Sequence, residues 1–203
     1  MTAKVFAIGF QKCGTTTLGV MLGNLDYRVA GYHSFRDLAE RPDLHWSDLE
    51  RRARSVMATH DAAKDTPWPL LYAFLDREFP GSKFIHVIRD PDVWIKSAVR
   101  DFADHPNALH QLIYGAPFPK GNEDVWLNRY RRHNAEVAAY FADRPADYLQ
   151  LRLEDLSYDR ICPFLDKPVI SAPPPMANTR LKKTLKMLWW RAKARLRRPS
   201  LKT

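Results

Sequence analysis

The sequence predicts an α/β fold of three layers, in which helices cover both faces of a central parallel sheet. Two short apolar runs, residues 5–8 and 84–88, have the composition of strands buried on both faces. Each run leads into a turn and then into a helical pattern, and strands that alternate with helices are typical of parallel sheets. A chain of 203 residues with 45% hydrophobic residues can form one domain with a substantial core.

The elements are expected to alternate from the N-terminus onward. Gly14 ends a turn after the first strand and threonines then open a helix, while Pro67 and Pro91 suit the first positions of two further helices. Residues 166–176 are rich in proline and should cross the domain as extended chain. The pattern predicts strands at 4–9, 27–30, 83–88 and 147–152, and helices at 15–25, near 34–41, 46–57, 67–79, 91–103, 122–143 and 154–165.

The turn after the first strand has the pattern of a phosphate-binding loop. Gly9 and Gly14 are separated by four residues, and in such a loop the backbone N–H groups and a helix N-terminus face an anion. Thr15 stands where the ATP-binding loop has its lysine, and Lys12 is the lysine that this loop contains. The loop should therefore bind an anionic group other than an ATP triphosphate with magnesium.

A second strand–turn–helix unit carries residues that suit a phosphate. Arg89 follows the strand at 83–88, and Ser97 comes eight residues later, in the first turns of the next helix. A guanidinium and a hydroxyl placed in this way can hold one phosphate from two sides. Because both units place their polar residues at the carboxyl ends of strands, the two sites should meet at one edge of the sheet.

Together the two units resemble the sulfotransferase family that uses 3′-phosphoadenosine 5′-phosphosulfate (PAPS), and its small, compact branch most of all. The resemblance extends over most of residues 4–179. Many members have proline where this chain has Gln11, and we expect Gln11 only to shape the turn. The Arg-Lys-Gly run that cytosolic members place near the C-terminus for the 3′-phosphate is absent. The two motifs are Gly9-x-x-Lys12-x-Gly14-Thr15-Thr16-x-Leu18 and Arg89-Asp90-Pro91 with Ser97.

The resemblance implies a P-loop-like sulfotransferase fold, PAPS as co-substrate with PAP as product, and no metal. The first motif would hold the 5′-phosphosulfate, with Lys12 on the leaving oxygen, and Arg89 and Ser97 would hold the 3′-phosphate. The acceptor would be a small molecule, a sugar or a lipid with a hydroxyl or amine group. The residues expected at the donor are Gln11, Lys12, Cys13, Gly14, Thr15, Thr16, Thr17, Arg89 and Ser97.

The catalytic base has three candidates. Cytosolic members of the family use a histidine in a His-x-Pro context, and Asp65-Thr66-Pro67 occupies nearly the matching place before Arg89. A carboxylate is consistent with other branches, which use glutamate, although Asp65 can also serve as the N-cap of the helix expected at Pro67. His60 is the second candidate and His33 the third.

The segment from Asp104 to Gly121 is expected to be a loop. Its length suits a lid over the acceptor, and an ordinary surface excursion is the alternative. Several aromatic residues can line an acceptor pocket or stack on adenine, although most are expected in the core. These residues are Trp68, Trp94, Phe102, Tyr114, Phe118 and Trp126.

The formal net charge of +9 comes from the C-terminus. Residues 180–203 contain ten basic residues and no acidic one, so residues 1–179 have a formal charge of −1. We therefore expect a near-neutral catalytic domain over residues 1–179 that binds no nucleic acid, followed by a basic amphipathic tail. Cys13 and Cys162 do not suggest a disulfide, and the first strand starts too early for a signal peptide, so a cytoplasmic location is expected.

Two other functions stay open. A P-loop-like kinase of a small molecule would have a lysine at position 15 and a magnesium-binding carboxylate at a strand end, and Thr15 argues against it. A non-catalytic member of the fold would act as a nucleotide-binding or membrane-associated module. The presence of Lys12, Arg89 and Ser97 argues against that function.

The basic tail generates a prediction of its own. Residues 180–198 are expected to form a helix with an apolar stripe that includes Leu185 and Trp189, and to attach to anionic membrane surfaces. Attraction of roughly 1 kcal/mol per basic residue near the surface should make adsorption weaken with salt, whereas the apolar part is not screened. Full-length protein should sediment with anionic vesicles, and a chain truncated after Asn178 should not. Full-length protein that stays in solution at low salt would contradict the prediction.

Overall fold

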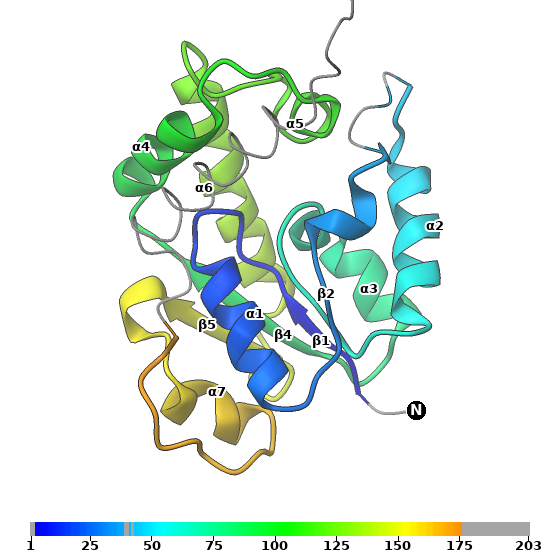
Figure 1. The fold of residues 1–203 in the computed structure, drawn as a ribbon, viewed down its shortest axis with the longest axis vertical. Helices are drawn as coiled ribbons and strands as arrows, with labels where there is room; N and C mark the ends of the chain where they lie inside the picture. The colour runs from blue at the N-terminus through cyan, green and yellow to red at the C-terminus, as the bar shows by residue number, and fades with distance from the viewer. Residues whose placement is uncertain (1–2, 39–40, 42, 176–203) are drawn as a thin grey trace, which may run out of the picture.

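A five-stranded parallel sheet in the order β2-β3-β1-β4-β5 forms the centre of the molecule (Figure 1). The computed structural model describes residues 3–38, 41 and 43–175. The predicted three-layer α/β fold is confirmed. The strands are β1 (Val5–Ala7), β2 (Val29–Ala30), β3 (Ala62–Ala63), β4 (Lys83–Ile88) and β5 (Tyr148–Arg152).

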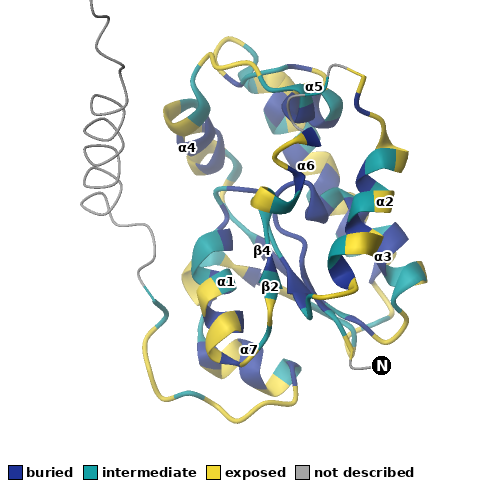
Figure 2. Ribbon diagram, turned by 45° about the vertical axis from the view of Figure 1, so that its right-hand side comes forward, coloured by how far each residue is buried: buried dark blue, intermediate teal, exposed yellow. Residues whose placement is uncertain are grey.

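Helices cover both faces of this sheet (Figures 1 and 2). On one face α1 and α7 lie together, and the Asn24 amide donates to the Tyr158 hydroxyl at 2.8 Å. On the other face α3 and α6 meet where the Tyr140 hydroxyl donates to Asp76 at 2.8 Å. Beyond the carboxyl ends of the strands lie α4 and α5. The helices are α1 (Thr15–Asn24), α2 (Trp46–Met57), α3 (Tyr72–Glu78), α4 (Pro91–Phe102), α5 (Ala108–Tyr114), α6 (Glu123–Tyr140) and α7 (Tyr158–Phe164), with 3-10 turns η1 (Tyr32–Phe35), η3 (Trp68–Leu71) and η4 (Leu153–Asp155).

The core is built on the two central strands. Phe6 of β1 lies opposite Ala63 of β3 on one side and Phe84 of β4 on the other. All of β1 and the interior of β4 are buried, as Figure 2 shows for the middle of the sheet. Continuous burial on both faces explains why these strands read as unbroken apolar runs in the sequence.

The segment expected to be a loop between Asp104 and Gly121 contains α5. The Asn107 side chain caps this helix by accepting from the N–H groups of Leu109 and His110, at 2.9 and 3.2 Å. Gly115 ends it with a φ of 74°, which suits glycine at a helix C-terminus. Both cap signals are present in the sequence, but the prolines that surround them favoured a loop.

Other differences concern short elements. The sequence analysis missed β3, because two alanines show no periodicity. The helix expected near 34–41 is represented among the described residues by the single turn η1. The helices predicted at 67–79 and 154–165 are each divided into a 3-10 turn followed by a shorter α-helix.

The proline-rich segment after α7 runs back along α1 without forming a helix or strand as far as residue 175. The Lys167 ammonium lies 5.3 Å from the centre of the Tyr27 ring, and the Thr17 hydroxyl donates to the Pro175 carbonyl at 3.2 Å. The predicted boundary at residue 179 and the helix predicted for residues 180–198 lie outside the described residues.

No helix in the described part of the chain is both long enough and apolar enough to cross a membrane.

Position 9, just after β1, requires glycine, because the backbone there closely approaches the backbone of β4. A Cβ atom added at Gly9 would lie 2.2 Å from the Val87 carbonyl oxygen of β4, a contact that side-chain rotation cannot relieve. We expect Gly9→Ala to lower the free energy of unfolding by at least about 2 kcal/mol, measured by urea denaturation.

Gly23 provides the matched control for that substitution. A Cβ atom there meets no atom within 4 Å, and the residue lies in α1. Gly23→Ala should therefore raise the free energy of unfolding by roughly 0.5–1 kcal/mol through helix propensity. Equal stability of the two variants would show that the β1–β4 approach is not rigid.

Candidate active site

A cleft of about 1000 Å³ opens at the carboxyl edge of the sheet. It is bounded by the loop after β1, the start of α1, the segment after β3, the end of β4, and residues of α4 and α5. The residues nominated from the sequence that line it are Gln11, Lys12, Gly14, Thr15, Thr16, Thr17, His33, Asp65, Arg89 and Ser97.

The loop of residues 9–14 opens into α1 as an anion site requires. Gly14 has a φ of 76°, and the first helical hydrogen bond runs from the Leu18 N–H to the Gly14 carbonyl at 3.0 Å. The N–H groups of residues 15–17 therefore precede the hydrogen bonding of the helix itself, at its positive end. This end of α1 forms one wall of the cleft, where a negative group is stabilised.

Side chains from other elements bind two carbonyl groups of this loop and that of Ile8, which precedes it. His133 Nε2 of α6 donates to the Ile8 carbonyl at 2.9 Å, and Trp94 Nε1 of α4 donates to the Gln11 carbonyl at 2.9 Å. Arg89 Nη1 donates to the Lys12 carbonyl at 3.4 Å. These three carbonyl oxygens, which would repel an anion, are thus engaged by donors of the protein.

Arg89 itself is fixed through its backbone. The buried Tyr130 hydroxyl accepts from the Arg89 N–H and donates to the Arg89 carbonyl, both at 2.8 Å. The Tyr130 ring stacks on Trp94 with ring centres 4.2 Å apart. Burial raises the pKa of Tyr130 well above its usual range, so the hydroxyl keeps its proton at physiological pH. This arrangement places the guanidinium beside the loop after β1.

Ser97 and Arg100 extend the site along α4. Ser97 is buried, and Arg100 Nη2 donates to its hydroxyl at 3.1 Å. Arg100 was not predicted as a site residue, although its spacing of three residues from Ser97 places both on one face of a helix. Asp90 begins α4 by accepting from the N–H groups of Asp92 and Val93, each at 3.0 Å.

Positive charge dominates the wall of the cleft. Of the described residues that line it, four are basic, whereas Asp65 is the only acidic one. The Lys12 ammonium hydrogen-bonds the Asp101 carboxylate, which also lies 3.6 Å from Arg100 Nε. The basic residues are Lys12, Lys64, Arg89 and Arg100. Such a cleft suits a ligand with more than one anionic group.

Asp65 is the second residue after β3 and thus stands at the same edge of the sheet as the loop. Its φ is 72°, and its Oδ1 accepts from the Thr66 N–H at 3.0 Å. Its Oδ2 is 4.0 Å from Lys64 Nζ, and the side chain is 24% exposed. Because η3 starts at Trp68 with no side-chain cap, Asp65 does not cap the helix expected at Pro67.

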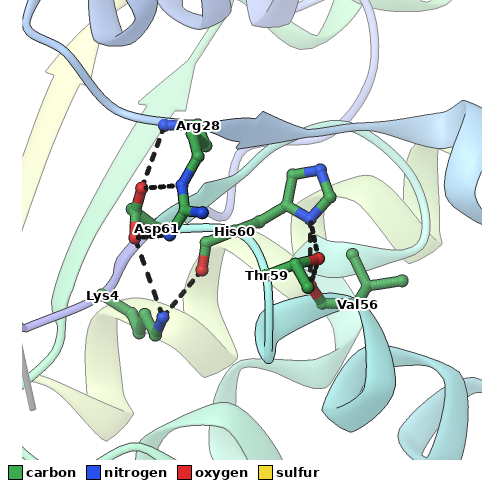
Figure 3. Close-up of polar contacts among 6 residues, drawn as sticks. All are labelled: Lys4, Arg28, Val56, Thr59, His60 and Asp61. Atoms are coloured by element: carbon green, nitrogen blue, oxygen red, sulfur yellow. Dashed lines mark hydrogen bonds and ion pairs between the residues drawn. The ribbon is translucent and has the colours of Figure 1, made fainter.

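His60 and Cys13 do not line the cleft. His60 precedes β3, at the amino end of that strand. Its Nδ1 lies 3.0 Å from the Val56 carbonyl and 3.1 Å from the Thr59 hydroxyl, and Figure 3 shows these contacts. The adjacent Asp61 pairs with Arg28 at 2.8 Å.

Cys13 is buried beneath the loop. Its N–H donates to the Phe10 carbonyl at 3.2 Å, and its Sγ lies 3.6 Å from the Tyr130 hydroxyl. Burial raises the pKa of the thiol to about 12, so it stays neutral. Cys13 therefore does not line the cleft, whereas its neighbours Lys12 and Gly14 do.

Gln11 was expected only to shape the turn, but its side chain also connects separate elements of the site. Its buried amide donates through Nε2 to the Tyr114 hydroxyl of α5 and accepts through Oε1 from the Thr66 hydroxyl. Burial raises the pKa of Tyr114 well above its usual range, so the phenol stays protonated. Gln11 therefore connects the loop after β1 with the residue next to Asp65 and with α5.

The opposite wall comes from η1 and α5. His110 lines the cleft, and burial lowers its pKa to about 4, which leaves the ring neutral at physiological pH. Asn107 lies beside it, so part of the segment predicted as a lid or a surface loop faces the cleft. Of the nominated aromatic residues, Phe102 lines the cleft, whereas Trp68, Trp94 and Trp126 are fully buried core residues.

Among the residues that the structure describes, no group of three or more histidine, cysteine or acidic side chains could hold a metal ion.

Comparison with known proteins agrees with the fold and the motifs. The profile of the family described as "Sulfotransferase domain" matches residues 4–114 and 98–182. No curated protein matches the chain. A sulfotransferase structure from Alicyclobacillus acidocaldarius is 18% identical, with a TM-score of 0.52, over 97% of this chain and 94% of that chain. A sulfotransferase domain from the curacin biosynthetic pathway is 17% identical, with a TM-score of 0.53, over 84% of this chain and 76% of that chain.

Because the sequence identities are low, the similarity to these two structures shows only that the fold is shared. The family match extends over most of the described residues and includes the loop after β1, Asp65, Arg89 and Ser97. The resemblance inferred from the two motifs is confirmed, and the chain belongs to the sulfotransferase family.

Proposed function

We propose that this sulfotransferase takes a sulfuryl group from PAPS and transfers it in line to a hydroxyl or amine of a small-molecule, sugar or lipid acceptor. The observation that supports this proposal most is that one cleft contains the loop after β1 together with Arg89 and Ser97. These residues come from two separate strand–turn–helix units, and each unit suits an anion on its own.

The residues present fit a donor with phosphates at two ends. The N–H groups at the start of α1, with the hydroxyls of Thr15 and Thr16, would bind the 5′-phosphosulfate. Arg89 and Ser97 would bind the 3′-phosphate. Arg100, which already donates to Ser97, would supply the third contact that the missing Arg-Lys-Gly run provides in cytosolic members. A cleft of about 1000 Å³ has the size of a site for a nucleotide.

In this reaction an acceptor oxygen or nitrogen forms a bond to sulfur while the bond from sulfur to the bridging oxygen breaks. The 5′-phosphate of PAP leaves with the electron pair, and the acceptor gives up its proton. Lys12 would stabilise the charge that develops on the bridging oxygen, because it is the cation of the loop itself. Positioning and electrostatic stabilisation would supply most of the rate.

Asp65 would accept the proton of the acceptor. It is the one acidic side chain among the described residues of the cleft wall, and it stands at the carboxyl end of the strand next to β1. Its neighbour Thr66 is bonded to Gln11, which places the proposed base in fixed relation to the donor loop. A general base held in position beside the acceptor increases the rate of the reaction by a large factor.

Binding and turnover should respond differently to changes at the two proposed positions. Arg89→Ala should weaken PAP binding at least about tenfold in calorimetric titrations, since charge-assisted hydrogen bonds to phosphate are lost. Asp65→Asn should bind PAP as the wild type does and lose about 100-fold or more in transfer from labelled PAPS to a panel of hydroxylated lipids, sugars and phenols.

His60→Ala is the control for this experiment, because His60 lies outside the cleft and should change neither quantity. Loss of transfer in His60→Ala with full transfer in Asp65→Asn would show that the base is assigned wrongly. Binding of ATP in place of PAP would favour the kinase, and PAP binding without transfer to any acceptor would favour a non-catalytic module.

Gln11→Leu should disturb both stability and catalysis. It leaves the buried hydroxyls of Thr66 and Tyr114 without their partner, which should cost roughly 2 kcal/mol in the free energy of unfolding. We expect turnover to fall more than PAP affinity, because Asp65 next to Thr66 loses its support.

Adding Thr66→Val and Tyr114→Phe to Gln11→Leu removes the stranded hydroxyls and tests this explanation. The triple variant should recover much of the lost stability in urea denaturation but not the turnover. A single Gln11→Leu variant as stable and active as the wild type would refute the role given to Gln11.

A further inference from the structure

A second cavity, of about 740 Å³, adjoins the cleft between η1 and the start of α5. The walls of the two cavities share Tyr32, His33 and Asn107, so the cavities are direct neighbours. None of the residues assigned to the donor lines the second cavity. Its volume lies in the range of sites for small molecules.

Among the described residues of its wall, this cavity has a positively charged side chain and no acidic one. Arg36 is the charged residue among its described lining residues, where it accompanies neutral polar groups such as Gln111. The Arg36 guanidinium makes no hydrogen bond or ion pair with any residue that the structure describes. The adjacent carboxylate of Asp37 does not neutralise it, because Arg52 binds both oxygens of Asp37, at 2.9 and 2.6 Å.

Other groups in the wall also favour an acceptor of hydrogen bonds. The Asn107 oxygen is occupied by the cap of α5, so the amide N–H groups are what its side chain can offer a ligand. Gln111 adds a further amide, and Tyr32 adds an aromatic ring that can cover an apolar surface. A guanidinium beside amide donors is the combination that recognises carboxylates and phosphates.

We infer that the second cavity binds the part of the sulfuryl acceptor remote from the reacting group, and that this part carries a carboxylate or phosphate. The inference rests on the proposed function, since it takes the shared wall at Tyr32, His33 and Asn107 as the passage from Asp65 to the remote part of the acceptor. It narrows the acceptors to anionic hydroxyl or amine compounds and disfavours uncharged and cationic ones.

Acceptor pairs that differ in one charge test this inference. Suitable pairs are 4-hydroxyphenylacetate with 4-hydroxyphenylacetamide for a carboxylate, and glucose 6-phosphate with glucose for a phosphate. Binding of each compound to PAP-saturated, full-length protein is measured by calorimetry, which does not require the compound to be turned over. The anionic member of at least one pair should bind about tenfold more tightly than its neutral partner.

Variants of Arg36 test whether this residue causes the preference for the anionic member of each pair. Arg36→Gln should remove the difference within the pair, and Arg36→Glu should reverse it, while PAP affinity stays unchanged in both. Arg160→Gln, which removes an exposed arginine of α7, is the matched control and should keep the difference. Equal binding within every pair, tighter binding of the neutral members, no binding by any compound, or a preference that survives Arg36→Gln would overturn the inference.

The test separates this inference from the proposed function. Wild-type protein that fails to bind PAP contradicts the donor assignment, whatever the acceptor pairs do. Wild-type protein that binds PAP and transfers sulfuryl groups equally to neutral and anionic acceptors contradicts only the assignment of the second cavity.

Discussion

The carbonyl oxygens of the loop after β1 are bound by side chains from α4, α6 and the end of β4, and the rest of the site depends on this arrangement. Trp94 binds the Gln11 carbonyl, Arg89 binds the Lys12 carbonyl and His133 binds the Ile8 carbonyl. A loop that is to hold an anion must present N–H groups and keep its carbonyls engaged elsewhere. Of the three donors, Arg89 belongs to the second motif and Trp94 lies between its Pro91 and Ser97, so the two motifs form one connected structure.

The same packing explains the large aromatic content around the site. Tyr130 stacks on Trp94 and binds the backbone of Arg89 through one hydroxyl. Rigid aromatic rings hold polar backbone groups in place at little cost in conformational entropy, because they have few rotatable bonds. A guanidinium that must meet a phosphate benefits from a backbone that is fixed before the ligand arrives.

With the proposed function, the cleft would have a donor side and an acceptor side, with Asp65 as the base. The proposed donor side combines the start of α1 with Arg89, Ser97 and Arg100, and the proposed acceptor side is formed by η1 and α5. Gln11 joins the sides through buried bonds to Thr66 and Tyr114. Such a connection would keep the proposed base and the acceptor wall in register with the donor loop.

The parts of the candidate site that could be predicted from the sequence are those whose residues lie close together in the chain. The loop at 9–14 and the pair Arg89 and Ser97 can be recognised by their spacing, because each lies within one strand–turn–helix unit. The role of Gln11 could not be read in this way, because its partners are 103 and 55 residues away in the chain. The strand β3 has two residues, too few for periodicity, so the position of Lys64 at its end was also missed.

The exclusion of His60 and Cys13 from the cleft has two different physical causes. Whether a residue near a strand reaches a site depends on which end of the strand it occupies, and β3 had to be located before His60 could be placed at its amino end. Cys13 lies within the loop motif, but alternate residues of a tight turn point to different sides. Arg100 was within reach of sequence reasoning, since it follows Ser97 by less than one helical turn.

A crystal structure of the full-length protein with PAP tests the account most directly. The account predicts the 5′-phosphate against the backbone N–H groups at the start of α1, close to Lys12, and the 3′-phosphate between Arg89, Ser97 and Arg100. The carbonyls of Gln11 and Lys12 should keep their bonds to Trp94 and Arg89 in that complex. A nucleotide bound with its phosphates away from this loop, or a loop whose carbonyls turn toward the phosphate, would contradict it.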